Sequence, residues 1–171
     1  MRNLEFKARV ADPQALLALA RGLGAELWGD LRQTDTYFKA ASGRLKLRET
    51  AGFQAELIAY DRDETADDRP SDYQIARTPD GAALREVLGN ALGVLVVVRK
   101  RRTLFLLDTT RIHLDNVDEL GSFFEIEVPV KEDVAAAEAQ LASLIEALGF
   151  ERTDGIRASY LDIMLERAGN G

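Results

Sequence analysis

The chain has 171 residues and a net charge of −7, which gives enough length for one domain with a real core and argues against a non-specific nucleic-acid binder, whose surface is broadly basic. It contains no cysteine, and this excludes disulfides and thiolate metal sites. No apolar run is long enough to cross a bilayer and the chain starts directly with a charged strand, so we expect one cytoplasmic domain over residues 1–171 that binds no membrane.

The first predicted element is a strand over residues 2–10, in which polar and apolar residues alternate with a period of two. Its polar face carries Asn3, Glu5, Lys7 and Arg9. Asp12 and Pro13 then predict the N-cap and the first position of a helix that ends near Gly24. The β-forming residues from 25 to 38 predict a long extended strand.

The middle of the chain alternates short strands with turns. Strands are predicted over residues 44–48, 53–62 and 71–77. In the first of these, three cations share one face, as period-2 geometry requires. Residues 61–70 are acidic and end in proline, which predicts a loop. Asp80 predicts the start of a helix that Gly93 ends.

The last part of the chain adds more strands and two helices. Strands are predicted over residues 94–107, 109–114 and 123–128. Helices are predicted from the Glu132–Asp133 cap to Leu148 and over residues 159–167. Seven or eight strands and four helices, joined mostly by short turns, favour an α+β fold with an antiparallel sheet that is closed or nearly closed on itself.

The charged residues on these strands allow two interpretations. If their faces point to bulk water, the charges are a polar exterior and are individually unimportant. If the faces point inward, they line a charged interior that needs a ligand, because each buried ion costs several kcal/mol without partners. Basic residues concentrate in strand-like segments such as 44–48 and 99–102, which indicates a compact anionic ligand rather than a polymer. A triphosphate with bound divalent cations would pair with both kinds of charge, because arginine and lysine bind phosphate oxygens and carboxylates bind the metal ions.

Short motifs follow one another along nearly the whole chain. They are Asn3–Lys7, Asp35–Phe38, Gly43–Glu49, Val98–Arg102, Arg111–Asp115, Leu120–Glu127 and Ser159–Leu161. This ordered set resembles the CYTH domain family, the triphosphate tunnel metalloenzyme superfamily, which includes class IV adenylate cyclases and thiamine triphosphatases. The Arg111–Asp115 and Leu120–Glu127 segments look closest to the class IV adenylate cyclases.

The resemblance implies an eight-stranded antiparallel β-barrel, a triphosphate tunnel with flanking helices, that binds Mg²⁺ or Mn²⁺. By matching position it implies that the metal ligands are Glu5, Asp115, Glu125 and Glu127. It implies that the phosphate ligands are Lys46, Arg48, Lys100, Arg102 and Arg111, with Arg62 as an addition. Lys7 takes the place of a catalytic lysine, as a phosphate contact or as a base. Asn3 stands where the family motif has its first glutamate, so one anionic metal ligand is missing and a second metal is in doubt.

The implied activity is a metal-dependent reaction on a triphosphate, foremost the conversion of ATP to cyclic AMP and pyrophosphate. An inorganic or thiamine triphosphatase and a non-catalytic triphosphate-binding or polyphosphate-binding module are the alternatives. The partner is then a triphosphate small molecule, not a nucleic acid, and the family is compatible with a homodimer. For His113, the only histidine, we favour a hydrogen-bonded supporting role, because imidazole is not a preferred Mg²⁺ ligand.

Overall fold

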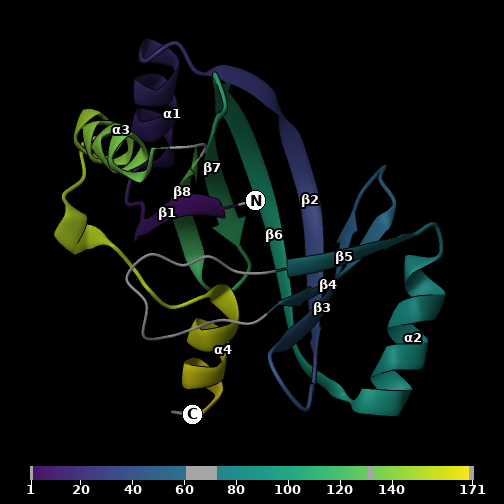
Figure 1. Cartoon of the computed structure of the whole chain (residues 1–171). Coiled ribbons are helices and arrows are strands. Elements are labelled where there is room, and N and C mark those ends of the chain that lie inside the picture. Colours follow the sequence, from purple (N-terminus) through teal and green to yellow (C-terminus); the bar gives the residue numbers. More distant parts are fainter. Residues whose placement is uncertain (1, 61–72, 131–132, 170–171) are drawn as a thin grey trace. The chain divides into compact units, whose positions relative to one another are not determined.

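The computed structural model describes residues 2–60, 73–130 and 133–169. Its strands are β1 (Arg2–Arg9), β2 (Glu26–Phe38), β3 (Arg44–Thr50), β4 (Ala55–Tyr60), β5 (Tyr73–Thr78), β6 (Val94–Leu107), β7 (Thr110–Val117) and β8 (Gly121–Val130). Its helices are α1 (Pro13–Gly22), α2 (Gly81–Leu92), α3 (Val134–Ala147) and α4 (Tyr160–Gly169), with a short 3₁₀ turn η1 (Arg152–Asp154). The strands form an eight-stranded sheet in the order β1-β8-β7-β6-β2-β3-β4-β5 (Figure 1). The predicted eight-stranded antiparallel architecture with flanking helices is confirmed.

The chain divides into two compact units, which are described separately. Within the described residues, unit 1 contains residues 2–30, 101–130 and 133–157, and unit 2 contains residues 31–60, 73–100 and 158–169. Strands β2 and β6 contribute residues to both units. The single domain predicted over residues 1–171 stays a prediction.

In unit 1, period-2 alternation gives β1, β7 and β8 one apolar face and one charged face. On the apolar face, Phe6, Phe124 and Ile126 are among the buried residues of the core. Helix α3 packs on β1 and β8, and α1 packs on β7, so this face is covered (Figure 1). The helices thus leave the charged face of the same three strands available to build a site.

Unit 2 repeats this arrangement on a smaller scale. Phe38, Leu47 and Ala55 form its buried cluster, and Leu84 and Leu88 of α2 pack against it. Because Lys46 and Arg48 alternate with Leu47 along β3, burying the leucine places both cations on the opposite face. The polar face of this unit therefore also follows from the alternation in the sequence.

The helix boundaries confirm the capping signals in the sequence. Asp12, Asp80 and Asp133 are the N-caps of α1, α2 and α3, and each accepts hydrogen bonds from backbone N–H groups of the first turn. Gly93 ends α2 at φ 82°, a conformation that glycine adopts without strain. Glu132, predicted to share the cap of α3, lies outside the described residues, as does the predicted loop over 61–70.

Most strands differ from the prediction by a few residues. Strand β3 continues to Thr50 rather than residue 48, and β7 covers Thr110–Val117 rather than 109–114. The strand predicted over 53–62 is described only from Ala55 to Tyr60, because residues 51–53 belong to the turn after β3 and residues 61–62 are outside the described part. The strand predicted over 123–128 is longer, Gly121–Val130, since pairing with β1 and β7 continues beyond its clear alternation. The strand predicted over 71–77 is described from Tyr73 to Thr78. Among the described helices, none has the length and hydropathy needed to span a membrane.

Candidate functional site

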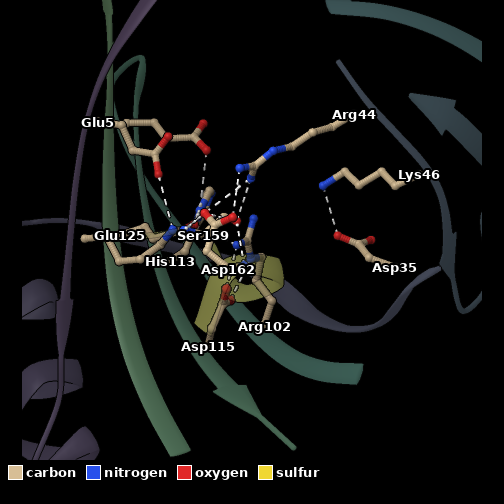
Figure 2. A network of polar contacts seen from close by, with 12 residues as sticks. Glu5, Asp35, Arg44, Lys46, Arg102, His113, Asp115, Glu125, Ser159 and Asp162 are labelled. Atoms are coloured by element: carbon tan, nitrogen blue, oxygen red, sulfur yellow. Dashed lines mark hydrogen bonds and ion pairs between the residues drawn. The ribbon is translucent and has the colours of Figure 1, made fainter. Parts of the chain in front are cut away.

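The charged face of unit 1 is assembled by the register of three neighbouring strands. Strand β8 pairs with β1 on one side and with β7 on the other, and its two glutamates face polar residues on both. The register produces two rows, Lys7–Glu125–His113 and Glu5–Glu127–Arg111. Arg102 joins these rows through Glu125, and Asp115 joins them through Arg102. We call all eight residues the β8 cluster, part of which is drawn in Figure 2.

Lys7 is buried between two carboxylates of this cluster. Its Nζ lies 2.9 Å from Glu125 Oε1 and 3.6 Å from Glu5 Oε1, and its side chain is 7% exposed. Glu5 is half-exposed, whereas Glu125 is buried like Lys7. Two carboxylates at this distance stabilise the ammonium form of the lysine. In the structure Lys7 is therefore a cation aimed at the charged face.

Arg102 joins the two buried carboxylates of the cluster. Its Nε and one terminal nitrogen donate to the two oxygens of Asp115, both at 2.6 Å, and that terminal nitrogen also donates to Glu125 Oε2 at 2.8 Å. Such a bidentate pair is among the strongest protein hydrogen bonds and fixes the plane of the guanidinium. Asp115 thus uses both of its oxygens on Arg102.

Arg111 and His113 complete the cluster from β7. Arg111 pairs with Glu127 at 2.9 Å and is the more exposed partner. His113 is buried, and its Nδ1 lies 3.4 Å from Glu125 Oε2 and 3.8 Å from Glu127 Oε1. Ligand atoms of His113, Glu125 and Glu127 all lie within 4.8 Å of one another. This donor set fits a divalent cation.

Unit 2 has its own buried carboxylate, Asp35 on β2. Arg48 donates to both Asp35 oxygens at 2.8 and 2.7 Å, and Lys46 Nζ lies 3.0 Å from Oδ2. Burial alone would raise the pKa of Asp35, but the charges of Arg48 and Lys46 outweigh it and hold that pKa well below its usual range. We call Asp35, Tyr37, Lys46, Arg48 and Tyr60 the Asp35 cluster.

Two tyrosines surround the lysine of the Asp35 cluster. Lys46 Nζ lies 5.4 Å from the ring centre of Tyr37 and 5.7 Å from that of Tyr60, within cation–π range. Burial, with the negative charge of Asp35 next, raises the pKa of Tyr37, and burial together with Tyr37 raises the pKa of Tyr60 to about 12. Both phenols are therefore neutral hydrogen-bonding groups at ordinary pH.

The start of α4 forms a third polar group within unit 2 (Figure 2). Ser159 N and Oγ both donate to Asp162 Oδ2, and Asp162 N donates back to Ser159 Oγ, which is a reciprocal cap of the helix. Arg44 of β3 donates to Ser159 Oγ and to both oxygens of Asp162. Burial by itself would raise the pKa of Asp162. The hydrogen bonds from Ser159 and Arg44 together have a larger effect in the opposite direction, so the pKa of Asp162 is lowered overall.

The structure brings most of the predicted site residues together within one of the two units. In unit 1 these are Glu5, Lys7, Arg102, Arg111, Asp115, Glu125 and Glu127. In unit 2, Lys46 and Arg48 share Asp35, and buried Lys100 lies with its Nζ 5.0 Å from the ring of Tyr160. Arg62 lies outside the described residues. Their roles as metal or phosphate ligands stay predictions.

Two carboxylates were not among the predicted site residues. Asp35 lies in a segment that the sequence singled out, but nothing in its spacing marked it as the partner of two cations. Asp162 had a local signal, since Ser159 and Asp162 have the spacing of a capping box. Its contact with Arg44, more than a hundred residues away along the chain, has no sequence signature.

Comparison with known proteins finds one family and a set of similar folds. The CYTH domain model matches residues 1–160. The PH1012 protein from Pyrococcus horikoshii OT3 is 22% identical with a TM-score of 0.83, over 93% of this chain and 97% of its own. A candidate adenylate cyclase from Vibrio parahaemolyticus is 20% identical with a TM-score of 0.79, over 96% and 98%.

A plant protein extends this set. HpAC1 from Hippeastrum, a candidate adenylyl cyclase described as having a dominant triphosphatase activity, is 16% identical with a TM-score of 0.68, over 99% of this chain and 96% of its own. No curated protein matches the sequence. At these identities the solved structures share the fold with this chain.

Proposed function

Because this chain belongs to the CYTH domain family, we propose that it is a divalent-metal-dependent enzyme that converts ATP to cyclic AMP and pyrophosphate. The observation that carries the proposal is the β8 cluster, where Lys7, Arg102, Asp115 and Glu125 are buried side by side. Each buried ion costs several kcal/mol in desolvation, and such clusters concentrate at functional sites. Cations that bind phosphate and carboxylates that bind metal are the donors that a metal–triphosphate complex needs.

In this proposal the phosphate oxygens are bound by arginines and lysines. Arg102 supports this role best, because Asp115 holds its guanidinium in one orientation and a fixed donor needs no reorganisation when charge develops on the phosphate. Arg111 has the same role in unit 1, and Lys46, Arg48 and Lys100 have it in unit 2. Arg62, outside the described residues, is retained as a further phosphate ligand.

Lys7 is the proposed catalytic residue. It is held as an ammonium by Glu125 and Glu5, so its simplest role is to stabilise negative charge on a phosphate oxygen during the reaction. To act as a base towards the ribose 3′-hydroxyl it must first lose its proton, which both carboxylates oppose. We therefore place Lys7 as a charge-stabilising contact.

The proposed metal ligands are Glu5, Asp115, Glu125 and Glu127. A bound Mg²⁺ or Mn²⁺ supplies charge stabilisation at the phosphate oxygens. Glu125 and Glu127 lie in adjacent rows of the β8 register, where their carboxylates approach the same point. Asn3 provides a neutral amide oxygen where the family motif has a carboxylate. A second metal ion would therefore have one fewer negatively charged ligand in this chain.

Hydrolysis of inorganic or thiamine triphosphate is the second candidate. HpAC1, which shares this fold, is described as having a dominant triphosphatase activity, so the fold is compatible with water as the nucleophile. In that reaction water attacks the terminal phosphorus, the bond from that phosphorus to the bridging oxygen breaks, and orthophosphate forms while the diphosphate is the leaving group. A module that binds triphosphate or polyphosphate without turnover is the third candidate, and Asn3 favours it because a metal ligand has lost its charge.

The deciding experiment resolves products. The protein is incubated with ATP, thiamine triphosphate or tripolyphosphate in Mg²⁺ or Mn²⁺, and orthophosphate, pyrophosphate and cyclic AMP are measured separately. Cyclic AMP with pyrophosphate from ATP supports the cyclase. Orthophosphate with thiamine diphosphate from thiamine triphosphate, or orthophosphate with pyrophosphate from tripolyphosphate, supports the triphosphatase. If no substrate reacts but triphosphate still raises the melting temperature of the protein, the result supports a module that binds triphosphate without turnover. If neither turnover nor stabilisation occurs, the proposal is wrong.

A matched pair of variants links activity to the β8 cluster. Arg101 and Arg102 are neighbours on β6 with opposite exposure, Arg101 being exposed and Arg102 buried. Arg102→Lys keeps the charge but loses the planar fork and should lower the rate by at least about a hundredfold. Arg101→Lys should leave the rate within about twofold. Equal effects of the two variants would contradict the assignment.

Two further expectations accompany the proposal. We propose that the protein acts in the cytoplasm, and that it assembles as a homodimer, which is compatible with the family. Light scattering of the purified protein measures the assembly directly, and a mass of one chain would remove the second expectation without affecting the enzyme assignment.

A further inference from the structure

The β8 cluster contains a histidine, whose ring nitrogen can bind a metal ion, at a place where a magnesium site normally has only oxygen ligands. His113 is 3% exposed, so its ring is withheld from solvent. Its Nδ1 points between Glu125 and Glu127 on the neighbouring strand, 3.4 Å and 3.8 Å from their nearest oxygens. The register explains this placement, because His113 is directly opposite Glu125 on β8.

The spacing of these donors matches the geometry of a coordinated ion. Metal–ligand distances for nitrogen and oxygen are about 2.1 Å, so two ligands of one ion lie about 3.0 to 4.2 Å apart, depending on the angle between them. Both Nδ1–oxygen distances fall inside this interval. Ligand atoms of all three residues lie within 4.8 Å of one another, so small side-chain movements would bring His113, Glu125 and Glu127 onto one cation without a change of strand register.

The chemistry of the imidazole decides which cation this is. Mg²⁺ binds oxygen ligands almost exclusively. Mn²⁺ also favours carboxylate oxygen, but as a first-row transition ion it gains more from an added imidazole nitrogen than Mg²⁺ does, and Fe²⁺, Co²⁺ and Zn²⁺ gain more still. We propose that His113 is a metal ligand together with Glu125 and Glu127, and that its nitrogen makes the site select Mn²⁺ over Mg²⁺. This inference rests on the proposed function for the role of the metal, but it can be tested without any substrate.

The existing contacts of Glu125 are compatible with a bound ion. Glu125 Oε2 accepts a bond from Arg102, which also holds both oxygens of Asp115. If a cation takes Oε2, Arg102 therefore keeps two of its three bonds in this cluster. Glu125 Oε1 remains with Lys7, 2.9 Å away, which keeps the carboxylate in place. The ion then replaces the weak 3.4 Å contact between Nδ1 and Glu125 and the 2.8 Å bond from Arg102 to Glu125 Oε2, while both bonds from Arg102 to Asp115 stay.

The first test uses the unmodified protein, with any affinity tag removed. Mn²⁺ is bound without triphosphate, and pulsed electron paramagnetic resonance detects coupling of the ion to a directly bound ¹⁴N nucleus. The chain has a single histidine, so an imidazole signal identifies His113 without a variant. Such a signal is the expected result. Mn²⁺ bound without nitrogen coupling, or no Mn²⁺ binding at all, would overturn the inference.

The second test measures selectivity. His113→Asn keeps a polar group near the position of Nδ1 but can offer oxygen instead of imidazole nitrogen. We expect its dissociation constant for Mn²⁺ to rise by about tenfold or more, while that for Mg²⁺ changes by less than about threefold. Circular dichroism and the melting temperature establish that the variant is folded. An equal loss for both metals would mean that His113 acts only by supporting the strand.

The two proposals fail in different ways. If Mn²⁺ binds without nitrogen coupling and triphosphate is still turned over, only the role of His113 is wrong. If Mn²⁺ binds with nitrogen coupling but no triphosphate reacts or stabilises the protein, the metal site stands and the enzyme assignment fails. If no divalent cation binds and no triphosphate reacts, both are wrong.

Discussion

Replacing Asp35 with asparagine tests whether this carboxylate is the internal counter-ion of unit 2. The substitution keeps the size and one acceptor oxygen but removes the charge that Lys46 and Arg48 share. Breaking a buried ion pair by removing one partner costs about 3–5 kcal/mol. Arg48 is 20% exposed and Lys46 is 12% exposed, so water screens part of the loss and we expect about 3 kcal/mol. In a chain of this size that lowers the melting temperature by about 6–12 °C.

The assay is urea unfolding at neutral pH, and the chain offers a matched control. Asp30 also pairs with an arginine, Arg101, but at 3.5 Å and with both side chains about half-exposed or more. Asp30 Oδ1 also accepts an exposed hydrogen bond from Thr103 Oγ1, which the amide oxygen of an asparagine at this position can still accept. Asp30→Asn should therefore change the free energy of unfolding by less than about 0.5 kcal/mol. If Asp35→Asn is as stable as Asp30→Asn, the reasoning is refuted, because the buried cations then do not need this carboxylate.

The stability gap between the wild type and Asp35→Asn should also depend on pH. The folded pKa of Asp35 is depressed below its unfolded value of about 3.9, so its stabilising effect is complete above the unfolded pKa and is lost as pH falls through the folded pKa. The gap should be constant between about pH 7 and pH 5 and narrow by about 1 kcal/mol at about pH 3. A gap that stays constant to about pH 3 would show that Asp35 is not held ionised by its partners.

Three further predictions concern other polar groups. Tyr60→Phe should leave the ultraviolet titration below about pH 11 unchanged, because burial and Tyr37 raise the pKa of Tyr60 to about 12; loss of an ordinary tyrosine step would contradict this. Asn3→Glu should tighten Mn²⁺ binding in calorimetry, since it adds a charged ligand, and unchanged affinity would remove Asn3 from the metal site. Arg44→Met should speed amide exchange in α4 but not in α2, as Asp162 loses its cation; equal protection of α4 in both proteins would show that the pair does not anchor the helix.

The alternation along a strand predicts which charges share a face, but it does not by itself predict burial, since Glu5 and Arg111 are about half-exposed. On β6 the two agree: Lys100 and Arg102 share one parity and are buried, whereas Arg99 and Arg101 have the other parity and are exposed. Period-2 geometry makes this prediction robust, since a slip by one residue would invert every side chain of the strand. The capping aspartates Asp12, Asp80 and Asp133 were predictable for a similar reason, because a cap depends on only a few adjacent residues.

The pairing between strands was not predictable in the same way. The resemblance implies that Asp115 is a metal ligand, and this stays a prediction; what the sequence did not indicate is that both Asp115 oxygens accept hydrogen bonds from Arg102. Asp35 and Asp162 illustrate the same limit, since each is neutralised by cations that only the folded register brings near. Alternation places a residue on a face, but its partner depends on the order of strands and their offset, and a single sequence does not encode these locally.

The charges of the β8 cluster have a consequence for how a ligand enters. Each of three cations in the cluster already has a carboxylate partner: Lys7 pairs with Glu125, Arg111 with Glu127 and Arg102 with Asp115. The protein therefore supplies its own counter-ions before any ligand binds. A metal–triphosphate complex is itself an ion pair, with an anion for the three cations and a cation for the three carboxylates. Its entry is then an exchange of partners between two salts rather than the capture of an anion by an open positive surface. The affinity therefore measures only the difference in free energy between the two sets of ion pairs.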